Sequence, residues 1–280
     1  MNSARVTGIE RKRDRPKPRP VAARPARTLA GILPVSAIVE KAVDEQPAQS
    51  SGSVAWIAGL LQANDSFYPT GSYAHSFGLE GLVQQGAIRD RDTLRVFILR
   101  CAVPALRHTE LPIATHAWRA FAEQDWKLIG ELCVLSSSLK TSREARSASE
   151  NIGRQRAELA ANLRDSPLAC EFLRRATESN WPCVAPVAAA LEGATLNTPL
   201  EGVLTGIYYS NIATLLSAAM KILRLGQNGS QALLTEALMS APKVTAAAAD
   251  TPIDQIGWFN PWLDISSARH ETADSRMFIS

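Results

Sequence analysis

Apolar residues recur at steps of three and four along most of the chain beyond residue 53, which is the spacing of one buried helix face. One stripe begins at Leu94, where Asp92 is a suitable N-cap, and another begins at Leu128 behind Asp125. No stretch alternates β-branched apolar residues with polar ones as a half-buried strand would. The pattern predicts an all-α fold, with a single multi-helix domain of about eight to ten helices over residues 51–280.

Two four-residue sequences have the form of a capping box, which opens a helix: Thr-Ser-Arg-Glu at 141–144 and Thr-Pro-Leu-Glu at 198–201. The helix behind the second should run to about residue 225, where Gly226 is predicted to supply a left-handed stop. Its stretch 202–220 is uncharged and long enough to span a bilayer, but it contains serine, threonine and asparagine. We therefore expect a buried core helix there and no membrane span.

The predicted helix 142–163 places small residues inward, among them Ala148 and Gly153. A glycine inside a helix costs roughly 1 kcal/mol relative to alanine. The close approach of a second helix would offset that cost, so we predict one. Four arginines flank the line of small residues, where they form either a solvated charged face or a surface for a partner: Arg143, Arg146, Arg154 and Arg156.

The first 50 residues differ in composition from the rest of the chain. Residues 1–27 hold nine Lys or Arg against two acidic residues, which leaves 21 basic and 25 acidic residues in the other 253. Prolines and charges predict a disordered basic Pro-rich tail at 1–50, followed by a mildly acidic folded domain. A nucleic-acid-binding domain would carry its basic face on the fold itself, so that class is excluded. No apolar signal segment is visible, and we expect a cytoplasmic protein.

The sequence lacks the patterns that support catalysis or metal binding. No lysine follows a glycine, so the phosphate-binding loop of P-loop GTPases is missing. The four histidines are never three or four residues apart, and the four cysteines form no CxxC pair, which leaves them as small apolar residues. We therefore expect no enzyme, no tightly bound cofactor and no resident metal.

Two segments have compositions typical of interaction sites. PTGSYAHSFGLEGLV (69–83) starts with a tight turn and continues into a predicted helix in which Gly78 and Gly81 share one side. The stretch from about 250 to 280 is predicted to be irregular and contains tryptophan, phenylalanine and arginine, which dominate protein interfaces. We interpret it as a C-terminal tail that orders on binding a partner.

Four blocks of the sequence resemble the motifs of the UreF family of urease accessory proteins, in the family's order. They are PTGSYAHSFGLE (69–80), EARSASENIGR (144–154), AMKILRLGQ (219–227) and SARHE followed by SRMF (267–278). Two departures from the family pattern are Ser72, where glycine is usual, and Lys221, where arginine is usual.

The resemblance implies an all-α homodimer that acts as a chaperone-like scaffold in urease maturation. Such a scaffold would bind a UreD/UreH-type accessory protein and recruit the GTPase UreG, whose GTP hydrolysis it would gate or accelerate. The complex would dock on apo-urease, and nickel would transit the complex as cargo during insertion.

The matched motifs and the arginines beside them mark a set of residues for partner contact. They are Gly71, Tyr73, His75, Ser76, Glu80, Arg146, Arg154, Arg269, His270, Glu271, Ser275, Arg276 and Phe278. For each, capping, core packing or plain solubility is the structural alternative.

Two other functions remain as alternatives to the scaffold. A stand-alone helical nickel-binding chaperone would bind stoichiometric nickel without partners. A helical hydrolase using Ser76 as nucleophile and His75 as base would turn over substrate by itself, although no strand–turn–helix elbow surrounds this pair.

Overall fold

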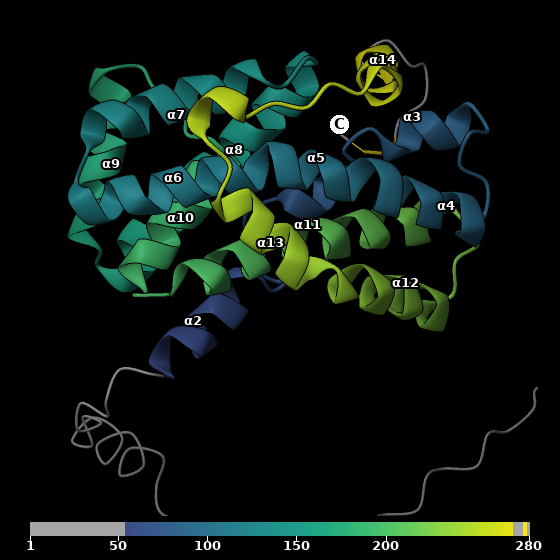
Figure 1. Cartoon of the computed structure of the whole chain (residues 1–280), viewed down its shortest axis with the longest axis horizontal. Helices are drawn as coiled ribbons and strands as arrows, with labels where there is room; N and C mark the ends of the chain where they lie inside the picture. Colours follow the sequence, from purple (N-terminus) through teal and green to yellow (C-terminus); the bar gives the residue numbers. More distant parts are fainter. Residues whose placement is uncertain (1–53, 271–276, 279–280) are drawn as a thin grey trace, which may run out of the picture. The chain divides into compact units, whose positions relative to one another are not determined.

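The computed structural model describes residues 54–270 and 277–278, and all regular secondary structure in these residues is helical (Figure 1). The all-α, single-domain prediction is confirmed, whereas the predicted disordered tail 1–50 lies outside the described residues. The α-helices are α2 (Ala55–Ala63), α3 (Leu79–Gln84), α4 (Arg91–Phe97), α5 (Val103–His108), α6 (Glu110–Glu123), α7 (Trp126–Ser138), α8 (Arg143–Arg164), α9 (Pro167–Glu178), α10 (Ala185–Thr195), α11 (Leu200–Ile222), α12 (Gln227–Met239), α13 (Ala241–Ala249) and α14 (Pro261–His270).

Some of these segments join into longer rods. The π-helical segment η2 (Ile98–Ala102) joins α4 to α5 without a break, and only Thr109 separates α5 from α6. Pro104 lies in the first turn of α5 and cannot donate a backbone hydrogen bond to the preceding turn. A wider π-helical turn at this point accommodates that missing bond.

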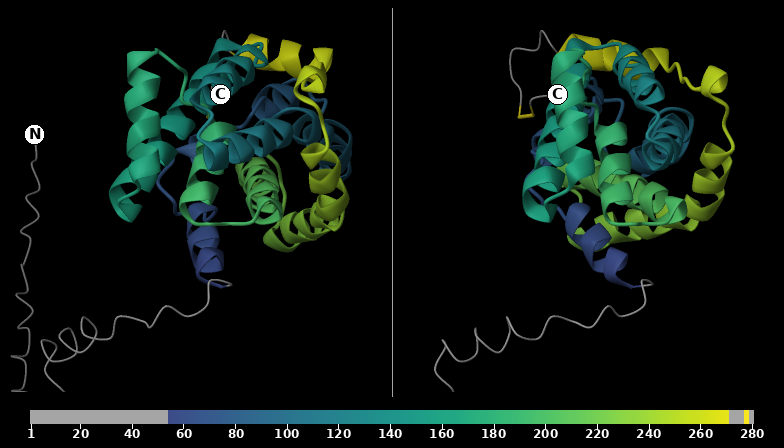
Figure 2. Two further views of the ribbon diagram at one scale, coloured as in Figure 1. Left: turned by 60° about the vertical axis from the view of Figure 1, so that its left-hand side comes forward. Right: turned by 90° about the vertical axis from the view of Figure 1, so that its left-hand side faces the viewer.

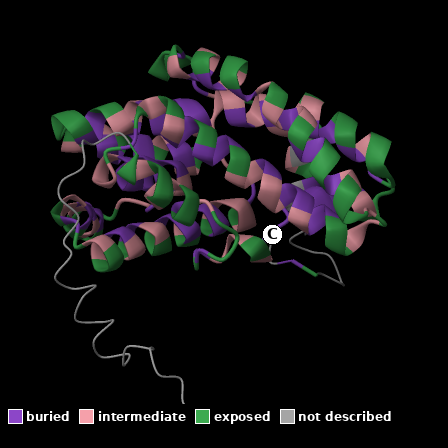
Figure 3. Cartoon of the chain, turned by 90° about the horizontal axis from the view of Figure 1, so that it is seen from below, coloured by how far each residue is buried: buried purple, intermediate pink, exposed green. Residues whose placement is uncertain are grey.

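Helix α10 forms the centre of the domain, where it packs on α8 and α6. Its residues Pro186 to Gly193 are all buried, as are Ala148 and Gly153 on α8. Figure 3 shows buried positions on the inner sides of the helices and exposed positions on their outer sides. A Cβ atom on Gly153 would lie 2.1 Å from the carbonyl oxygen of Cys183, just before α10. The close approach predicted from the small residues of helix 142–163 is therefore confirmed. We call this contact the α8–α10 seam.

A buried charge network crosses the α8–α10 seam. The Glu192 carboxylate on α10 accepts hydrogen bonds from Arg156 Nε on α8 at 2.7 Å and from the Tyr68 hydroxyl at 2.6 Å. Burial, followed by the Glu192 charge, raises the pKa of Tyr68. Arg156 also donates to the carbonyl oxygen of Ala63 at 2.6 Å. Because Ala63 is the last residue of α2, the network fixes that end of the helix.

The helix starts show which residues cap them. Asp125 caps α7 as predicted, but Asp90 caps α4 and Ser142 caps α8, so the predictions of Asp92 and Thr141 were wrong. In both corrected cases the cap has an extended backbone, and its side chain accepts the N–H of the residue three positions later.

Helix α11 differs from the prediction at both ends. Pro199 occupies its N-cap position, and the buried hydroxyl of Thr198 has no hydrogen-bond partner, so the predicted capping box is absent. The helix ends before Leu223, whose backbone is extended, and Gly226 has φ −73°. The left-handed stop at Gly226 was therefore a wrong prediction.

Among the described residues, α11 alone is long and apolar enough to pass as a membrane span. Over half of its most apolar window, 56%, is buried inside the domain, where α11 packs against α6, α12 and α13. Its composition is thus explained by packing, in agreement with the predicted core helix.

The first and last helices of the described chain, α2 and α14, lie at the surface of the domain (Figure 1). Helix α2 projects from the edge of the domain (Figures 1 and 2), where it contacts α11, and only Ala63 in it is buried. At the other end, α14 occupies part of the stretch 250–280 that was predicted to be irregular, so that prediction was wrong for Pro261–His270.

Candidate protein-interaction site

Three residues in the left-handed backbone region shape the loop before α3. The φ angle is +77° at Gly71, +52° at Phe77 and +83° at Gly78. Glycine adopts this region without steric cost, which explains two of the three positions. Because Gly78 is the N-cap of α3, it lies at the helix start and not inside it. The prediction that Gly78 and Gly81 share one side of a helix is therefore wrong.

The same loop turns His75 and Ser76 inward and Tyr73 outward. His75 is 6% exposed and Tyr73 is 65% exposed. The Ser76 hydroxyl is fully buried and accepts a hydrogen bond from the backbone N–H of Glu80 at 3.4 Å. Burial lowers the pKa of His75, and the nearby Glu144 carboxylate opposes this only in part. The environment of His75 therefore favours the neutral imidazole.

Glu80, in the first turn of α3, holds the end of the chain. Its carboxylate accepts a hydrogen bond from the backbone N–H of Met277 at 2.8 Å and another from that of Phe278 at 3.1 Å. Glu80 and Phe278 are each 5% exposed, so the bond from Phe278 is buried, whereas the bond from the exposed Met277 is only partly buried. Two residues predicted as partner contacts, nearly 200 positions apart in the sequence, are thus in direct contact.

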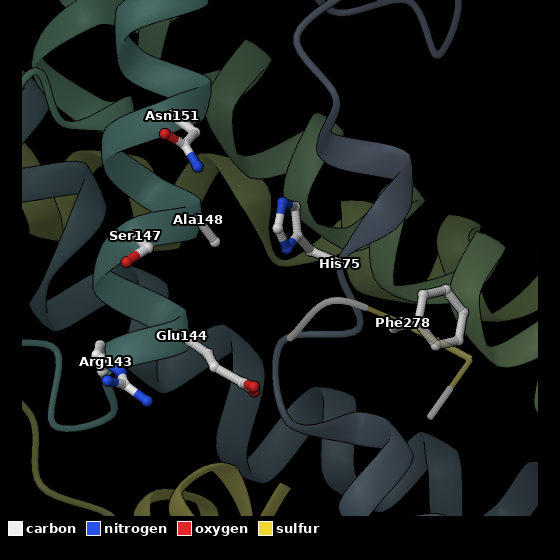
Figure 4. A pocket seen from close by; sticks show the side chains of 7 residues that line it. All are labelled: His75, Arg143, Glu144, Ser147, Ala148, Asn151 and Phe278. Atoms are coloured by element: carbon white, nitrogen blue, oxygen red, sulfur yellow. The ribbon is translucent and has the colours of Figure 1, made fainter. Parts of the chain in front are cut away.

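A cavity of about 450 Å³ adjoins this contact, and Figure 4 shows its lining. Five residues of α8 form one wall, opposite His75 from the loop and Phe278 from the end of the chain. The α8 residues are Arg143, Glu144, Ser147, Ala148 and Asn151. The cavity therefore brings together three of the four motif segments, or residues next to them.

Lys221 adds the remaining motif segment. Its ammonium nitrogen lies 5.3 Å from the centre of the Phe278 ring, at a distance suited to a cation–π interaction. The same nitrogen lies 3.4 Å from the carbonyl oxygen of Tyr73. All four segments with family-like motifs therefore meet around Phe278 and the adjoining cavity.

The C-terminal segment is also anchored upstream of Phe278. Trp258 stacks on His108 at 5.1 Å, and the N–H of Gly257 donates to the carbonyl oxygen of His108 at 2.9 Å. Further along, α14 packs on α3 so closely that a Cβ on Gly81 would lie 2.6 Å from the Ser266 hydroxyl. We call the α3–α14 contact, together with the Glu80–Phe278 contact, the C-terminal dock.

Comparison with known proteins shows to which family this chain belongs. Residues 88–238 match the family model of UreF, which is more than half of the chain. The urease accessory protein UreF of Granulibacter bethesdensis is 30% identical over 85% of this chain and 99% of its own length. The UreF 1 protein of Brucella melitensis is 30% identical over 79% of this chain and 91% of its own length, and the UreF of Bacillus sp. (strain TB-90) 25% identical over 80% and 99%. The chain belongs to the UreF family.

As a UreF family member, the chain is a urease accessory protein that takes part in urease maturation. The predicted resemblance is thereby confirmed. The fold shows where this UreF chain places its four motif segments.

The structure locates part of the C-terminal motif of this UreF chain. Arg269 and His270 lie in the last turn of α14, although their side chains are outside the description. Glu271, Ser275 and Arg276 lie outside the described residues. The dock therefore contacts the chain on the two sides of this motif, at Ser266 and at Met277.

Arg146 and Arg154 do not line the cavity. Arg146 donates to the backbone carbonyls of Lys140 and Thr141, at 2.6 and 3.1 Å, and so ties α8 to the end of α7. Arg154 is exposed on α8; burial raises the pKa of Cys183, and the Arg154 charge opposes this only in part. The structure therefore gives Arg146 a structural contact with the end of α7.

Sequence reasoning missed several residues of the site. Lys221 was noted only as a departure from the family pattern, and Asn151 was not singled out. It also missed an apolar stripe that begins at Val54, the N-cap of α2, and continues with Ile57 and Leu61 on the helix, all exposed at three- and four-residue steps. That periodicity was visible in the sequence and could have been found there.

The described part of the chain contains no group of three or more His, Cys, Asp or Glu side chains placed to hold a metal ion. His116 is hydrogen-bonded to the carbonyl oxygen of Thr251, and His108 is stacked on Trp258. All four cysteines are free thiols, of which Cys133 and Cys183 are buried.

Proposed function

We propose that this chain is a non-catalytic cytoplasmic scaffold that joins a UreD/UreH-type protein to the GTPase UreG and presents the complex to apo-urease. Nickel is the cargo that passes through this complex. Holding donor and acceptor in one assembly makes the transfer effectively intramolecular and raises its effective concentration. The gating or acceleration of GTP hydrolysis on UreG belongs to the same proposal.

The observation that carries the proposal is the exposed aromatic surface held by the C-terminal dock. Phe259 is 73% exposed, Trp262 65% and Ile265 51%, although the backbone that carries them is anchored on α3 and on His108. Large exposed apolar side chains on an anchored segment are typical of a protein-binding surface. We assign this surface to the UreD/UreH-type partner.

A second apolar surface supports the predicted homodimer. Val54, Ile57 and Leu61 form the exposed stripe of α2, which projects from the domain (Figure 2). A second copy of the chain can cover the stripe by placing its own α2 against it, as an isologous contact requires. Leu61→Glu should shift the chain from dimer to monomer in light scattering, and Gln62→Glu on the same helix is the matched control. A dimer that persists in Leu61→Glu would rule out α2 as the interface.

The surroundings of Ser76 and His75 argue against the hydrolase alternative. The Ser76 hydroxyl is fully buried and already accepts the Glu80 N–H, so a substrate carbonyl has no path to it without rearrangement of α3. Both residues instead support the loop that receives the chain end.

The test of the scaffold is deletion of residues 269–280. We expect the truncated chain to keep its helical circular dichroism and to lose co-purification with the UreD/UreH-type protein. The point variant Trp262→Ala should weaken the same interaction, whereas Met239→Ala, an exposed apolar residue on α12, should not. Unchanged complex formation after the deletion would contradict the assignment.

Nickel titration separates the scaffold from the stand-alone chaperone. Calorimetry of the purified chain should show no stoichiometric nickel binding at micromolar affinity. A tight stoichiometric site would instead favour the nickel-binding chaperone.

A further inference from the structure

Helix α2 packs on α11 through one of its faces. A Cβ atom on Gly202 of α11 would lie 3.0 Å from the Trp56 ring, and one on Gly206 would lie 3.1 Å from the Leu60 side chain. The two glycines are one helical turn apart, and so are the two side chains that they receive. Helix α2 has only nine residues, and a helix of that length is not stable alone in water. Its placement therefore depends on its contacts with the domain.

The C-terminal end of α2 is tied to the core by an arginine. The last four carbonyl oxygens of a helix have no partner inside the helix. Those of residues 60–62 accept N–H groups of the loop that follows, and that of Ala63 accepts Arg156 Nη2 at 2.6 Å. The same guanidinium donates through Nε to Glu192 at 2.7 Å. One planar group therefore joins the buried helix α10 to the last residue of α2.

A second arginine of α8 reaches the same end of α2. Arg164 donates to the side-chain oxygen of Gln62 at 3.2 Å and lies 3.7 Å from the Glu192 carboxylate. Helix α2 itself contains no charged residue. The C-terminal end of a helix carries a partial negative charge, so two guanidinium groups beside it stabilise α2 in this position.

We infer that Arg156 and Arg164 are positioning residues for self-association of the chain. This inference rests on the proposed function, in which a second copy covers the exposed stripe of α2. Trp56 and Leu60 are only half-buried on α11, so their contacts alone leave α2 free to tilt. The two arginines restrict that motion from one end. A surface that is fixed before association loses less entropy on binding, which increases affinity.

Hydrogen exchange followed by mass spectrometry tests the positioning in single chains. The Leu61→Glu chain provides the monomeric background. In it, Arg156→Lys keeps a charge beside Glu192 but lacks the planar fork that also reaches Ala63. We expect the peptide 55–63 to exchange about tenfold faster, as loss of a charge-assisted hydrogen bond predicts, while α10 exchanges within twofold of its former rate. Unchanged exchange in α2 would overturn the inference.

Sedimentation equilibrium measures the effect on self-association in chains that retain Leu61. Arg156→Lys should raise the dimer dissociation constant at least tenfold, because both copies lose the tie in an isologous dimer. Arg164→Gln should raise it two- to fivefold, since its contacts are longer. This second variant keeps the ion pair between Arg156 and Glu192, so it should fold normally.

The same type of substitution on another helix provides the matched control. Arg174 lies on α9, where its exposed side chain pairs with Glu171 and Glu178. Arg174→Lys should leave both the exchange of α2 and the dimer dissociation constant as they are in the wild type. An equal effect of Arg174→Lys would show that any arginine matters in the same way and would overturn the positioning role.

The inference and the proposed function fail in different ways. If Leu61→Glu remains a dimer, the proposed interface is wrong, and faster exchange of α2 in Arg156→Lys would still support the tie to the core. If Leu61→Glu is a monomer while both arginine variants dimerise like the wild type, the interface stands and the positioning role is wrong. Faster exchange in α10 as well as in α2 would show a loss of general stability and would also overturn the role.

Discussion

The α8–α10 seam and the C-terminal dock are both close contacts at a helical glycine, but they serve different purposes. In each, a helical glycine lets another segment approach closely: Gly153 faces the carbonyl of Cys183 and Gly81 faces Ser266. The seam is enclosed by other helices and is crossed by the Arg156–Glu192 ion pair. The dock leaves α14 with exposed aromatic and aliphatic side chains. Close packing thus stabilises the domain at the seam, whereas at the dock it holds a surface in place for a partner.

The largest effect should come from the charge inside the seam. Glu192→Ala would leave the buried Arg156 guanidinium and the Tyr68 hydroxyl without their acceptor. Breaking a buried ion pair from one side costs about 3–5 kcal/mol. Urea unfolding followed by circular dichroism measures the loss, and the exposed Glu201→Ala should lose less than about 1 kcal/mol. Equal losses for the two variants would show that the network contributes little.

A side chain at Gly153 should have the next largest effect. Leucine there would collide with the backbone before α10, because even a Cβ atom would lie 2.1 Å from the Cys183 oxygen. We expect a loss of about 3 kcal/mol in the free energy of unfolding. Gly226→Ala is the control, because nothing lies within 4 Å of the position where its Cβ would be and its φ of −73° suits alanine. Normal stability of Gly153→Leu would contradict the close packing of the seam.

The corresponding change at the dock should affect binding more than stability. In Gly81→Val, the new Cβ would lie 2.6 Å from the Ser266 hydroxyl and 3.0 Å from its carbonyl oxygen, so α14 must move away. We expect a loss of about 1–2 kcal/mol in unfolding free energy and at least tenfold weaker binding of the UreD/UreH-type protein. A variant with full affinity would remove the distinction between the dock and the seam.

The smallest effect should be the pH dependence at His75. Burial lowers the pKa of this imidazole, so the unfolded chain takes up the proton at a higher pH, near 6.5, than the folded chain does. The unfolded state then holds more protons between the two pKa values, and stability falls as pH decreases below about 6.5. Urea midpoints at pH 7.5 and 5.5 should differ less for His75→Gln than for the wild type. An equal difference would assign the pH dependence to other groups.

The sequence predicted what depends on local pattern. Periodicity located most helices, and the small residues around Gly153 predicted the seam, because a glycine inside a helix requires compensation nearby. Asp125 was predicted correctly as a cap because an N-cap hydrogen bond joins residues that are close in the sequence. The predicted cap at Thr198 was wrong because Pro199, the next residue, takes the cap position. Which residue does so depends on the backbone angles at the helix start.

The dock could be predicted only in part. The family motifs marked Glu80 and Phe278 separately, but periodicity gives no information on a contact between residues so far apart in the sequence. Lys221 meets the Phe278 ring only after α11 has packed in the core and the chain end has returned to α3. Phe77 adopts a left-handed backbone that its residue type does not favour, so the start of α3 was also misplaced.

Urease activation in cells tests the central claim that the chain acts by presenting helical surfaces to other proteins. In cells that express urease but lack this chain, urease should accumulate in an inactive, nickel-poor form, and the wild-type chain should restore its activity and nickel content. A chain carrying Trp262→Ala and Ile265→Ala should fold normally and fail to restore either. Active, nickel-loaded urease in cells without the chain, or with the double variant, would contradict the account.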